Sequence, residues 1–204
     1  MYLKLQKGVV LSSIIFFCLA QLSGCSVNHT NGLHHDGPPR YDFDASKIPD
    51  AVPKVEPRSP HGNKSYTIGH HRYVVLHSAR GYHTRGTASW YGASFHGKYT
   101  STRERYSLYK MTAASPTLPL PSYVMVTNLG NGRHVILKVN DRGPFRCHRI
   151  LDVSYAAAKK LGFSGDGTAH VDVRTIDPKR WAADHSVAND QKFAQNQYDK
   201  KQQA

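Results

Sequence analysis

Two segments of alternating residues, close together in the chain, constrain its fold most strongly. In residues 123–128 and 134–139 valine or leucine recurs at every second position, at 124 and 126 and at 135, 137 and 139, which is the spacing of one face of a β-strand. Between them lies Gly130-Asn131-Gly132, and glycine accepts the positive φ angles that tight turns require. The pattern therefore predicts a β-hairpin with one buried face.

Shorter segments extend this prediction to a whole domain. Residues 87–90 and 169–175 are predicted as further strands, and Ser154 and Gly162 bracket a helix rich in alanine and lysine. Several short strands separated by Gly and Pro turns are typical of a small β-barrel, because closing the sheet removes its exposed edges. The expected fold class is therefore mainly β, with one short helix.

The amino terminus predicts export and lipid attachment. Two lysines precede an apolar run over residues 9–20, which is short for a membrane span and typical of a secretory signal. Leu22-Ser23-Gly24-Cys25 matches a bacterial lipobox, so residues 1–24 are the predicted signal and Cys25 the predicted lipid site. Ser26 favours the outer membrane of a Gram-negative cell, on its periplasmic face. An ordinary signal cut elsewhere, with the cysteine unmodified, is the alternative.

The rest of the chain divides by composition. Residues 25–64, rich in Pro, Gly, His and Asp, are predicted to be a flexible tether, and residues 65–83 a small hairpin extension. Residues 84–176 are expected to contain the barrel. Residues 177–204 are expected to be a polar, disordered tail, with no C-terminal glycan-binding domain.

The charge of the chain indicates an anionic partner. The formal net charge is +13, and residues 84–176 contain 13 Lys and Arg against five Asp and Glu. Such a surface attracts anionic polymers. An exported chain meets little nucleic acid, whereas peptidoglycan carries lactyl and stem-peptide carboxylates. We therefore expect peptidoglycan glycan strands as the partner and no nucleic acid; a basic surface that serves solubility alone is the alternative, and no protein partner is indicated.

Neither a metal nor a cofactor is expected. The pairs His34-His35 and His70-His71 lack the three- or four-residue spacing that places two ligands on one helical face. Cys147 is the one thiol left after export and lipidation, so no internal disulfide is expected. Its surroundings do not match a cysteine-enzyme signature.

Six sequence blocks together resemble the rare lipoprotein A family. The blocks are Ala88-Ser89-Trp90-Tyr91-Gly92, Phe95-His96-Gly97, Thr112-Ala113-Ala114, Thr117-Leu118-Pro119-Leu120, Val139-Asn140-Asp141-Arg142-Gly143-Pro144-Phe145 and Leu151-Asp152-Val153-Ser154-Tyr155-Ala156-Ala157-Ala158. The resemblance implies a six-stranded double-psi β-barrel related to expansins and to barrel-type lytic transglycosylases. It also implies endolytic cleavage of peptidoglycan between N-acetylmuramic acid (MurNAc) and N-acetylglucosamine (GlcNAc), forming 1,6-anhydro ends, with a preference for peptide-poor glycan.

Asp141 and Glu104 are the candidate catalytic residues. Asp141 follows a predicted strand, beside a Gly143-Pro144 corner where a turn can hold its carboxyl rigidly. A lytic transglycosylase uses the sugar's own 6-hydroxyl as nucleophile, so one carboxyl can first donate and then accept a proton. The resemblance implies that Glu104 stabilises positive charge on the sugar ring or orients that hydroxyl. A turn aspartate and a solvated loop carboxylate are the alternatives.

Trp90, Tyr91, Ser115 and Arg142 are the candidate substrate-binding residues. Trp90 and Tyr91 can stack on sugar faces, but neighbours in a regular strand point to opposite sides, so at most one lines the groove. Ser115 stands where the family usually has histidine, and serine cannot carry a charge at neutral pH. A non-catalytic peptidoglycan-binding or expansin-like wall-loosening module on the same barrel is therefore the alternative function.

Overall fold

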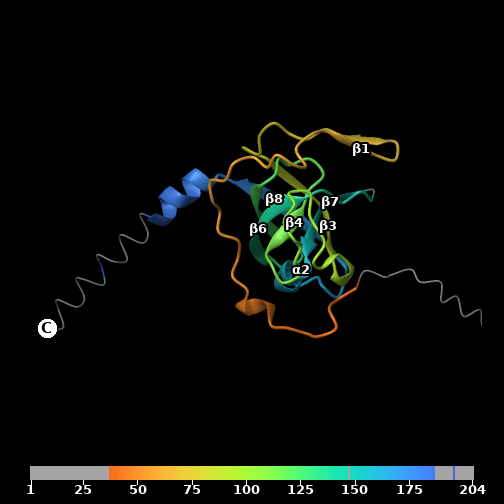
Figure 1. Ribbon diagram of the computed structural model, residues 1–204. Coiled ribbons are helices and arrows are strands. Elements are labelled where there is room, and N and C mark those ends of the chain that lie inside the picture. The colour runs from red at the N-terminus through yellow and green to blue at the C-terminus, as the bar shows by residue number, and fades with distance from the viewer. Residues whose placement is uncertain (1–36, 147, 187–194, 196–204) are drawn as a thin grey trace, which may run out of the picture. The chain divides into compact units, whose positions relative to one another are not determined.

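The described part of the chain, residues 37–146, 148–186 and 195, is mainly β in this computed structural model (Figure 1). Its strands are β1 (Tyr66–Ile68), β2 (His71–Tyr73), β3 (His83–Tyr91), β4 (Thr112–Ala114), β5 (Ser122–Asn128), β6 (His134–Asp141), β7 (Arg149–Ser154) and β8 (Thr168–Ile176). A 3₁₀ turn, η1 (Ala45–Lys47), precedes the strands, and a second, η2 (Ala93–Phe95), lies between β3 and β4. The helix α2 (Tyr155–Leu161) lies between β7 and β8. The predicted signal, Cys25 and Cys147 lie outside the described residues.

Six of the strands close into a barrel in the order β3-β7-β4-β6-β5-β8. β3 runs parallel to β7 and β4 runs parallel to β6, whereas the other neighbouring strands are antiparallel. β1 and β2 form a separate two-stranded sheet. The predicted mainly β fold is confirmed: a six-stranded double-psi β-barrel with a short helix, preceded by a small hairpin.

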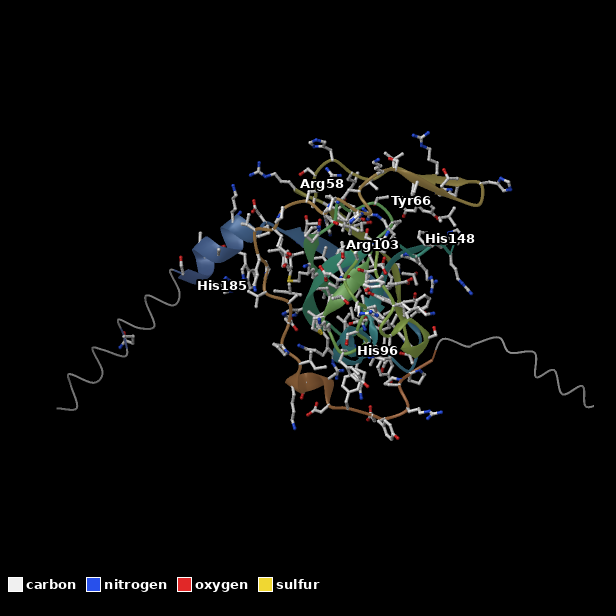
Figure 2. The ribbon with its side chains drawn as sticks, viewed as in Figure 1. Arg58, Tyr66, His96, Arg103, His148 and His185 are labelled. Atoms are coloured by element: carbon white, nitrogen blue, oxygen red, sulfur yellow. The ribbon has the colours of Figure 1, made fainter. Side chains whose placement is uncertain are left out.

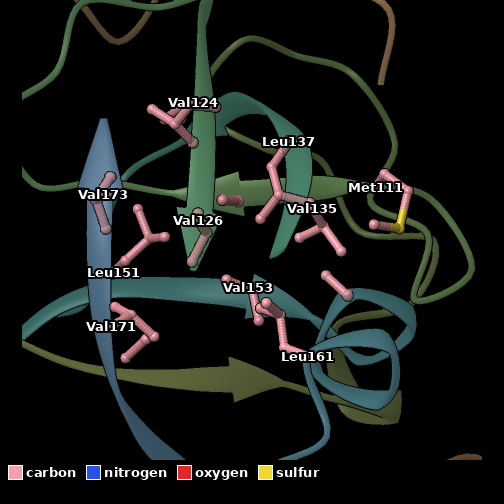
Figure 3. Close-up of a cluster of buried hydrophobic side chains, with 14 of the residues drawn as sticks. Met111, Val124, Val126, Val135, Leu137, Leu151, Val153, Leu161, Val171 and Val173 are labelled. Carbon is pink, nitrogen blue, oxygen red and sulfur yellow. The ribbon is translucent and has the colours of Figure 1, made fainter. Parts of the chain in front are cut away.

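The predicted central hairpin is present as β5 and β6, and its alternation fills the barrel. Val124 pairs with Leu137 and Val126 pairs with Val135. All four side chains are at most 1% exposed and lie among the other core residues in Figure 3. Full burial of one such side chain contributes about 1.5–3 kcal/mol. The core therefore fixes β6 firmly, up to Asp141 at its end.

The predicted helix is also present, as α2. The Ser154 hydroxyl accepts a hydrogen bond from the Ala157 backbone N–H at 3.2 Å, which caps the first turn. Gly162 ends the helix in the left-handed conformation with a φ of 76°. Residues 156–158 are alanines that are fully buried, so the helix packs closely on the barrel.

The segment before the hairpin is bound to the barrel. Residues 37–64, which we call the strap, belong to the predicted flexible tether, of which residues 25–36 lie outside the described part. Ser59, for example, donates a backbone hydrogen bond to the Leu120 carbonyl at 2.9 Å, and Figure 1 shows the strap running along the barrel. The prediction of a free tether is wrong for the strap. Backbone groups make many of its contacts, so its sequence shows no apolar period.

The start of the predicted disordered tail is helical, over residues 178–186. The Asp177 carboxylate accepts a hydrogen bond from the Lys179 backbone N–H at 2.9 Å, and Pro178 occupies the first helical position. Asp followed by Pro favours the start of a helix, and the prediction of a disordered tail did not use this signal. No helix among the residues that the structure describes has both the length and the apolar character needed to cross a membrane.

Candidate active site

One row of residues across four strands carries two acidic groups of the site. Ala114 of β4 pairs with Asp141 of β6 on one side and with Asp152 of β7 on the other. Asp152 pairs in turn with Ser89 of β3, whose hydroxyl donates to the carboxylate. The barrel thus brings two aspartates to the two sides of one small alanine. Sequence reasoning missed Asp152, although a carboxylate inside an otherwise apolar strand is a recognisable signal.

Asp141 is held by the loop that carries Glu104. Its Oδ1 atom accepts hydrogen bonds from the Ser101 backbone N–H at 2.8 Å, the Ser101 hydroxyl at 2.7 Å and the Arg142 backbone N–H at 2.7 Å. Among the described residues, no hydrogen bond reaches Oδ2. This arrangement suits an acid/base, because one oxygen is fixed while the other can exchange a proton with a substrate.

The strap closes one side of the site. Gly62 has a φ of 75°, and a side chain there would place its Cβ 3.0 Å from the Cβ of Ser101. The Gly62 carbonyl also accepts a hydrogen bond from Arg142 Nε at 2.8 Å. The strap therefore packs against the same serine that orients Asp141, so a segment predicted to be a tether helps to build the site.

Glu104 belongs to a chain of charged groups that ends in the strap. Its Oε2 accepts a hydrogen bond from Asn140 Nδ2 at 2.8 Å, and its Oε1 lies 3.0 Å from Lys138 Nζ. The same Nζ lies 2.9 Å from Glu56 Oε2, and the Tyr123 hydroxyl donates to the other Glu56 oxygen. The Glu104 side chain is 45% exposed. It is therefore both oriented and accessible.

Lys138 keeps its positive charge between two carboxylates. Burial lowers the pKa of Lys138, but hydrogen bonds to Glu56 and Glu104 outweigh this effect and raise it above its ordinary value. For Glu56, burial raises the pKa, and hydrogen bonds from Tyr123 and Lys138 bring it below its ordinary value. The ammonium group therefore links the strap carboxylate electrostatically to the candidate catalytic glutamate.

Arg142 and Ser115 support the site instead of lining it. Arg142 donates from one guanidinium nitrogen to the carbonyls of Ser115 at 2.9 Å and Leu118 at 2.6 Å, and burial lowers the pKa of the guanidinium. Ser115 is 1% exposed, and its hydroxyl accepts a hydrogen bond from the Leu118 backbone N–H at 3.2 Å. Both residues thus order the loop after β4, which differs from the predicted contact with substrate.

Trp90 and Tyr91 are packing residues in this structure. Tyr91 is 8% exposed and stacks on Tyr106 with ring centroids 4.1 Å apart, and burial raises the pKa of its hydroxyl well above the ordinary value. Trp90 packs edge-to-face on Tyr155 at 4.9 Å, and its buried Nε1 has no hydrogen-bond partner among the described residues. The prediction that Tyr91 or Trp90 stacks on sugar is therefore not supported. Other rings near Asp141 come from the half-buried Tyr66 of β1 and Tyr73 of β2 and from the exposed Phe145 after β6.

The groups that can transfer a proton here are carboxyls. Asp141, Asp152 and Glu104 are each held by neutral donors or by a nearby cation. No group of three His, Cys, Asp or Glu side chains within the described ranges is arranged to hold a metal ion. Fixed carboxyls next to a basic, exposed loop suit acid/base work on a polymer.

Comparison with known proteins agrees with the barrel fold. A family model described as "Lytic transglycolase" matches residues 83–173. The chain is 55% identical over 150 residues to the endolytic peptidoglycan transglycosylase RlpA of Pseudomonas aeruginosa, covering 74% of this chain and 44% of that protein. It is 37% identical over 173 residues to the protein of the same name from Rickettsia felis, covering 83% of this chain and 72% of that protein.

The matched family model and the strand order define a double-psi β-barrel of the lytic transglycolase class. The extent of the match to the Rickettsia protein shows further that the chain belongs to the RlpA family. The chain spans less than half the length of the Pseudomonas relatives that it matches.

Proposed function

We propose that this chain is a lytic transglycosylase that cleaves peptidoglycan glycan strands between MurNAc and GlcNAc. The observation that carries the proposal is the Asp141 carboxyl, fixed through one oxygen by the loop that also presents Glu104. The names of the relatives from Pseudomonas aeruginosa and Vibrio cholerae, both endolytic peptidoglycan transglycosylases, support the same reaction.

In this mechanism Asp141 first acts as an acid. It gives its proton to the glycosidic oxygen while the bond between that oxygen and C1 of MurNAc breaks. The 6-hydroxyl oxygen of the same sugar then bonds to C1, and its proton returns to Asp141. The product is a 1,6-anhydro end, no water is consumed, and the acid is regenerated. Glu104, held beside Lys138, stabilises the positive charge that develops on the ring.

Asp152 is the second candidate for the same proton transfer. It lies on the other side of Ala114 from Asp141, and its side chain is 17% exposed. Its Oδ1 accepts a hydrogen bond from Ser89, and Arg149 lies 3.9 Å away. Two carboxyls so placed can divide the donation and acceptance of the proton between them, so the experiment includes both.

The substrate and location follow from charge and from the amino terminus. The excess of Lys and Arg over residues 84–176 suits glycan whose lactyl carboxylates are free because the stem peptides have been removed. A lipid on Cys25 holds the protein on the periplasmic face of the outer membrane in this proposal. Cys25 itself lies outside the described residues.

The test uses the purified chain on two kinds of sacculi, intact and amidase-treated. Mass spectrometry measures the yield of 1,6-anhydro ends, and thermal melting checks folding. Asp141→Asn keeps the shape of the carboxyl but cannot donate the proton, so we expect the yield to fall by about 10²- to 10⁴-fold while binding is retained. Glu104→Gln should also reduce it.

The variants separate the candidate roles. Full activity in a folded Asp141→Asn protein, together with loss in Asp152→Asn, moves the acid to Asp152. Binding of sacculi by the wild-type chain with no anhydro ends from either substrate contradicts the enzyme and favours the non-catalytic binding or wall-loosening module. Ser115, which replaces the histidine usual in the resembled family, is the observation in favour of that second function.

A further inference from the structure

An aromatic cluster joins the β1-β2 hairpin to the segment that follows Asp141. Tyr66 and Tyr73 are paired across the hairpin, and their rings stack with centroids 5.1 Å apart and an interplanar angle of 15°. Phe145 meets both rings edge-to-face, 5.9 Å from Tyr66 and 5.6 Å from Tyr73. Phe145 is 43% exposed. We call these three residues the aromatic platform.

The aromatic platform lies next to the candidate acid. Phe145 is separated from Asp141 by Arg142, Gly143 and Pro144 alone. Burial raises the pKa of Tyr66 to about 12, and the nearby charges of Arg142 and Asp141 act on the same hydroxyl. Figure 2 shows Tyr66 at the end of the barrel that carries the hairpin. The platform is therefore continuous with the site.

Hydrogen bonds fix the platform relative to that site. The Tyr66 hydroxyl donates to the Pro116 carbonyl at 2.9 Å, and the Leu76 backbone N–H donates to the Thr117 carbonyl at 2.8 Å. Both acceptors belong to the loop that the Arg142 guanidinium binds. One loop therefore positions both the hairpin and the residue next to Asp141. An isolated hairpin of two three-residue strands is marginal in water, so this attachment is what orders it.

We propose that the aromatic platform binds sugar rings of the glycan strand beside the bond that Asp141 cleaves. This inference rests on the proposed function and assigns a glycan subsite to residues outside the barrel. Flat aromatic rings pack well against the apolar faces of sugars. Arg146 follows Phe145, and His71 packs on Tyr73 at 4.6 Å, so basic groups for a lactyl carboxylate flank the rings.

The experiment removes single rings and measures glycan binding separately from turnover. Tyr73→Ala and Phe145→Leu are compared with Tyr73→Phe and Phe145→Tyr, which keep the rings. Binding to amidase-treated sacculi is measured in the Asp141→Asn background, where turnover does not interfere. We expect the first pair to weaken binding about tenfold each, which corresponds to about 1.4 kcal/mol, and the second pair to bind as the parent does.

Tyr41→Ala is the matched control. Tyr41 is 80% exposed and lies in the part of the strap that Figure 1 shows at the opposite end of the barrel from the hairpin. With Asp141 intact, the platform variants should raise KM for denuded glycan and leave kcat nearly unchanged, because the rings bind substrate but do not transfer protons. The control should change neither.

The outcomes separate this inference from the proposed function. If the wild-type chain forms anhydro ends but folded Tyr73→Ala and Phe145→Leu proteins bind glycan as tightly as the control, the platform is overturned and the enzyme stands. If no anhydro ends form but these variants lose glycan binding, the subsite stands and the enzyme is overturned. If Phe145→Tyr, which keeps the ring, loses as much glycan binding as Phe145→Leu, a role for the ring is also contradicted.

Discussion

At the scale of single residues, Lys138 sets the charge of the candidate site. Its ammonium is shared between Glu104, the candidate catalytic glutamate, and Glu56, which comes from the strap. Asn140 donates a hydrogen bond to the other Glu104 oxygen. Lys138 and Asn140, two positions apart on β6, therefore hold the Glu104 carboxylate from both of its oxygens.

Lys138→Met is expected to reduce catalysis. Without the ammonium, Glu104 and Glu56 lose the cation that both contact, and Glu104 is less firmly held where it could stabilise positive charge on the sugar ring. The kcat/KM for the formation of anhydro ends should therefore fall, with folding checked by thermal melting. Lys138→Arg keeps the charge and should keep most of the wild-type kcat/KM. Wild-type kcat/KM in a folded Met variant would show that Glu104 does not act through this ion pair.

At the scale of elements, the sequence predicted those strands that have a period or a turn signal. β5 and β6 show alternating valines and a glycine turn, and α2 has both a cap and a terminating glycine. β4 and β7 were missed because β4 is three buried residues and β7 has no regular alternation. Asp141 and Glu104 were found as candidates, but Asp152 is brought beside Asp141 by strand pairing that no local pattern reveals.

Aromatic residues show the same limit. Trp90 and Tyr91 are in a strand, and their chemistry suits sugar binding, yet the barrel packs both against other rings. Phe145 lies more than 70 residues after Tyr66 and Tyr73, and it meets them only after the hairpin has attached to the loop after β4. The residue types therefore predicted that aromatic rings stack on sugars. Which rings are available for this depends on the tertiary fold, which the sequence pattern does not reveal.

The strap should contribute measurably to stability. Asn63 donates to the Leu120 carbonyl at 2.7 Å and accepts from the Leu120 backbone N–H at 2.8 Å. Asn63→Ala removes these two hydrogen bonds, together with one to the Ser59 carbonyl at 2.9 Å and a longer one from Arg142 at 3.5 Å. At about 0.5–1.5 kcal/mol each, the loss of the two hydrogen bonds to Leu120 alone should lower the free energy of unfolding by about 1–3 kcal/mol. Denaturant unfolding measures this, and limited proteolysis should cut the strap faster.

Asp44→Ala provides the control for the strap. Asp44 is in the same segment, but its hydrogen bonds stay within its own turn, to Ser46. Its loss should leave the contact between strap and barrel intact. If Asn63→Ala and the wild-type chain have equal stability and equal protease resistance, contacts other than those of Asn63 hold the strap on the barrel.

At the scale of the whole molecule, the basic charge predicts salt-sensitive binding to the wall. The distance over which exposed charges act falls from about 10 Å at 0.1 M salt to about 3 Å at 1 M. Pull-down with sacculi should therefore recover much less protein at high salt, although the aromatic platform retains part of the binding. Recovery that does not change over this range would remove long-range charge as the main attraction.

The attachment of the strap also limits how far an anchored barrel can travel. For a chain held in the membrane at Cys25, a free segment up to residue 64 would allow a span of about 140 Å when fully extended. Because the strap is bound from residue 37, the connecting chain can span at most about 40 Å. The enzyme would then work on the glycan layer next to its own membrane, and its reach would be set by the strap and not by the length of the sequence before the barrel.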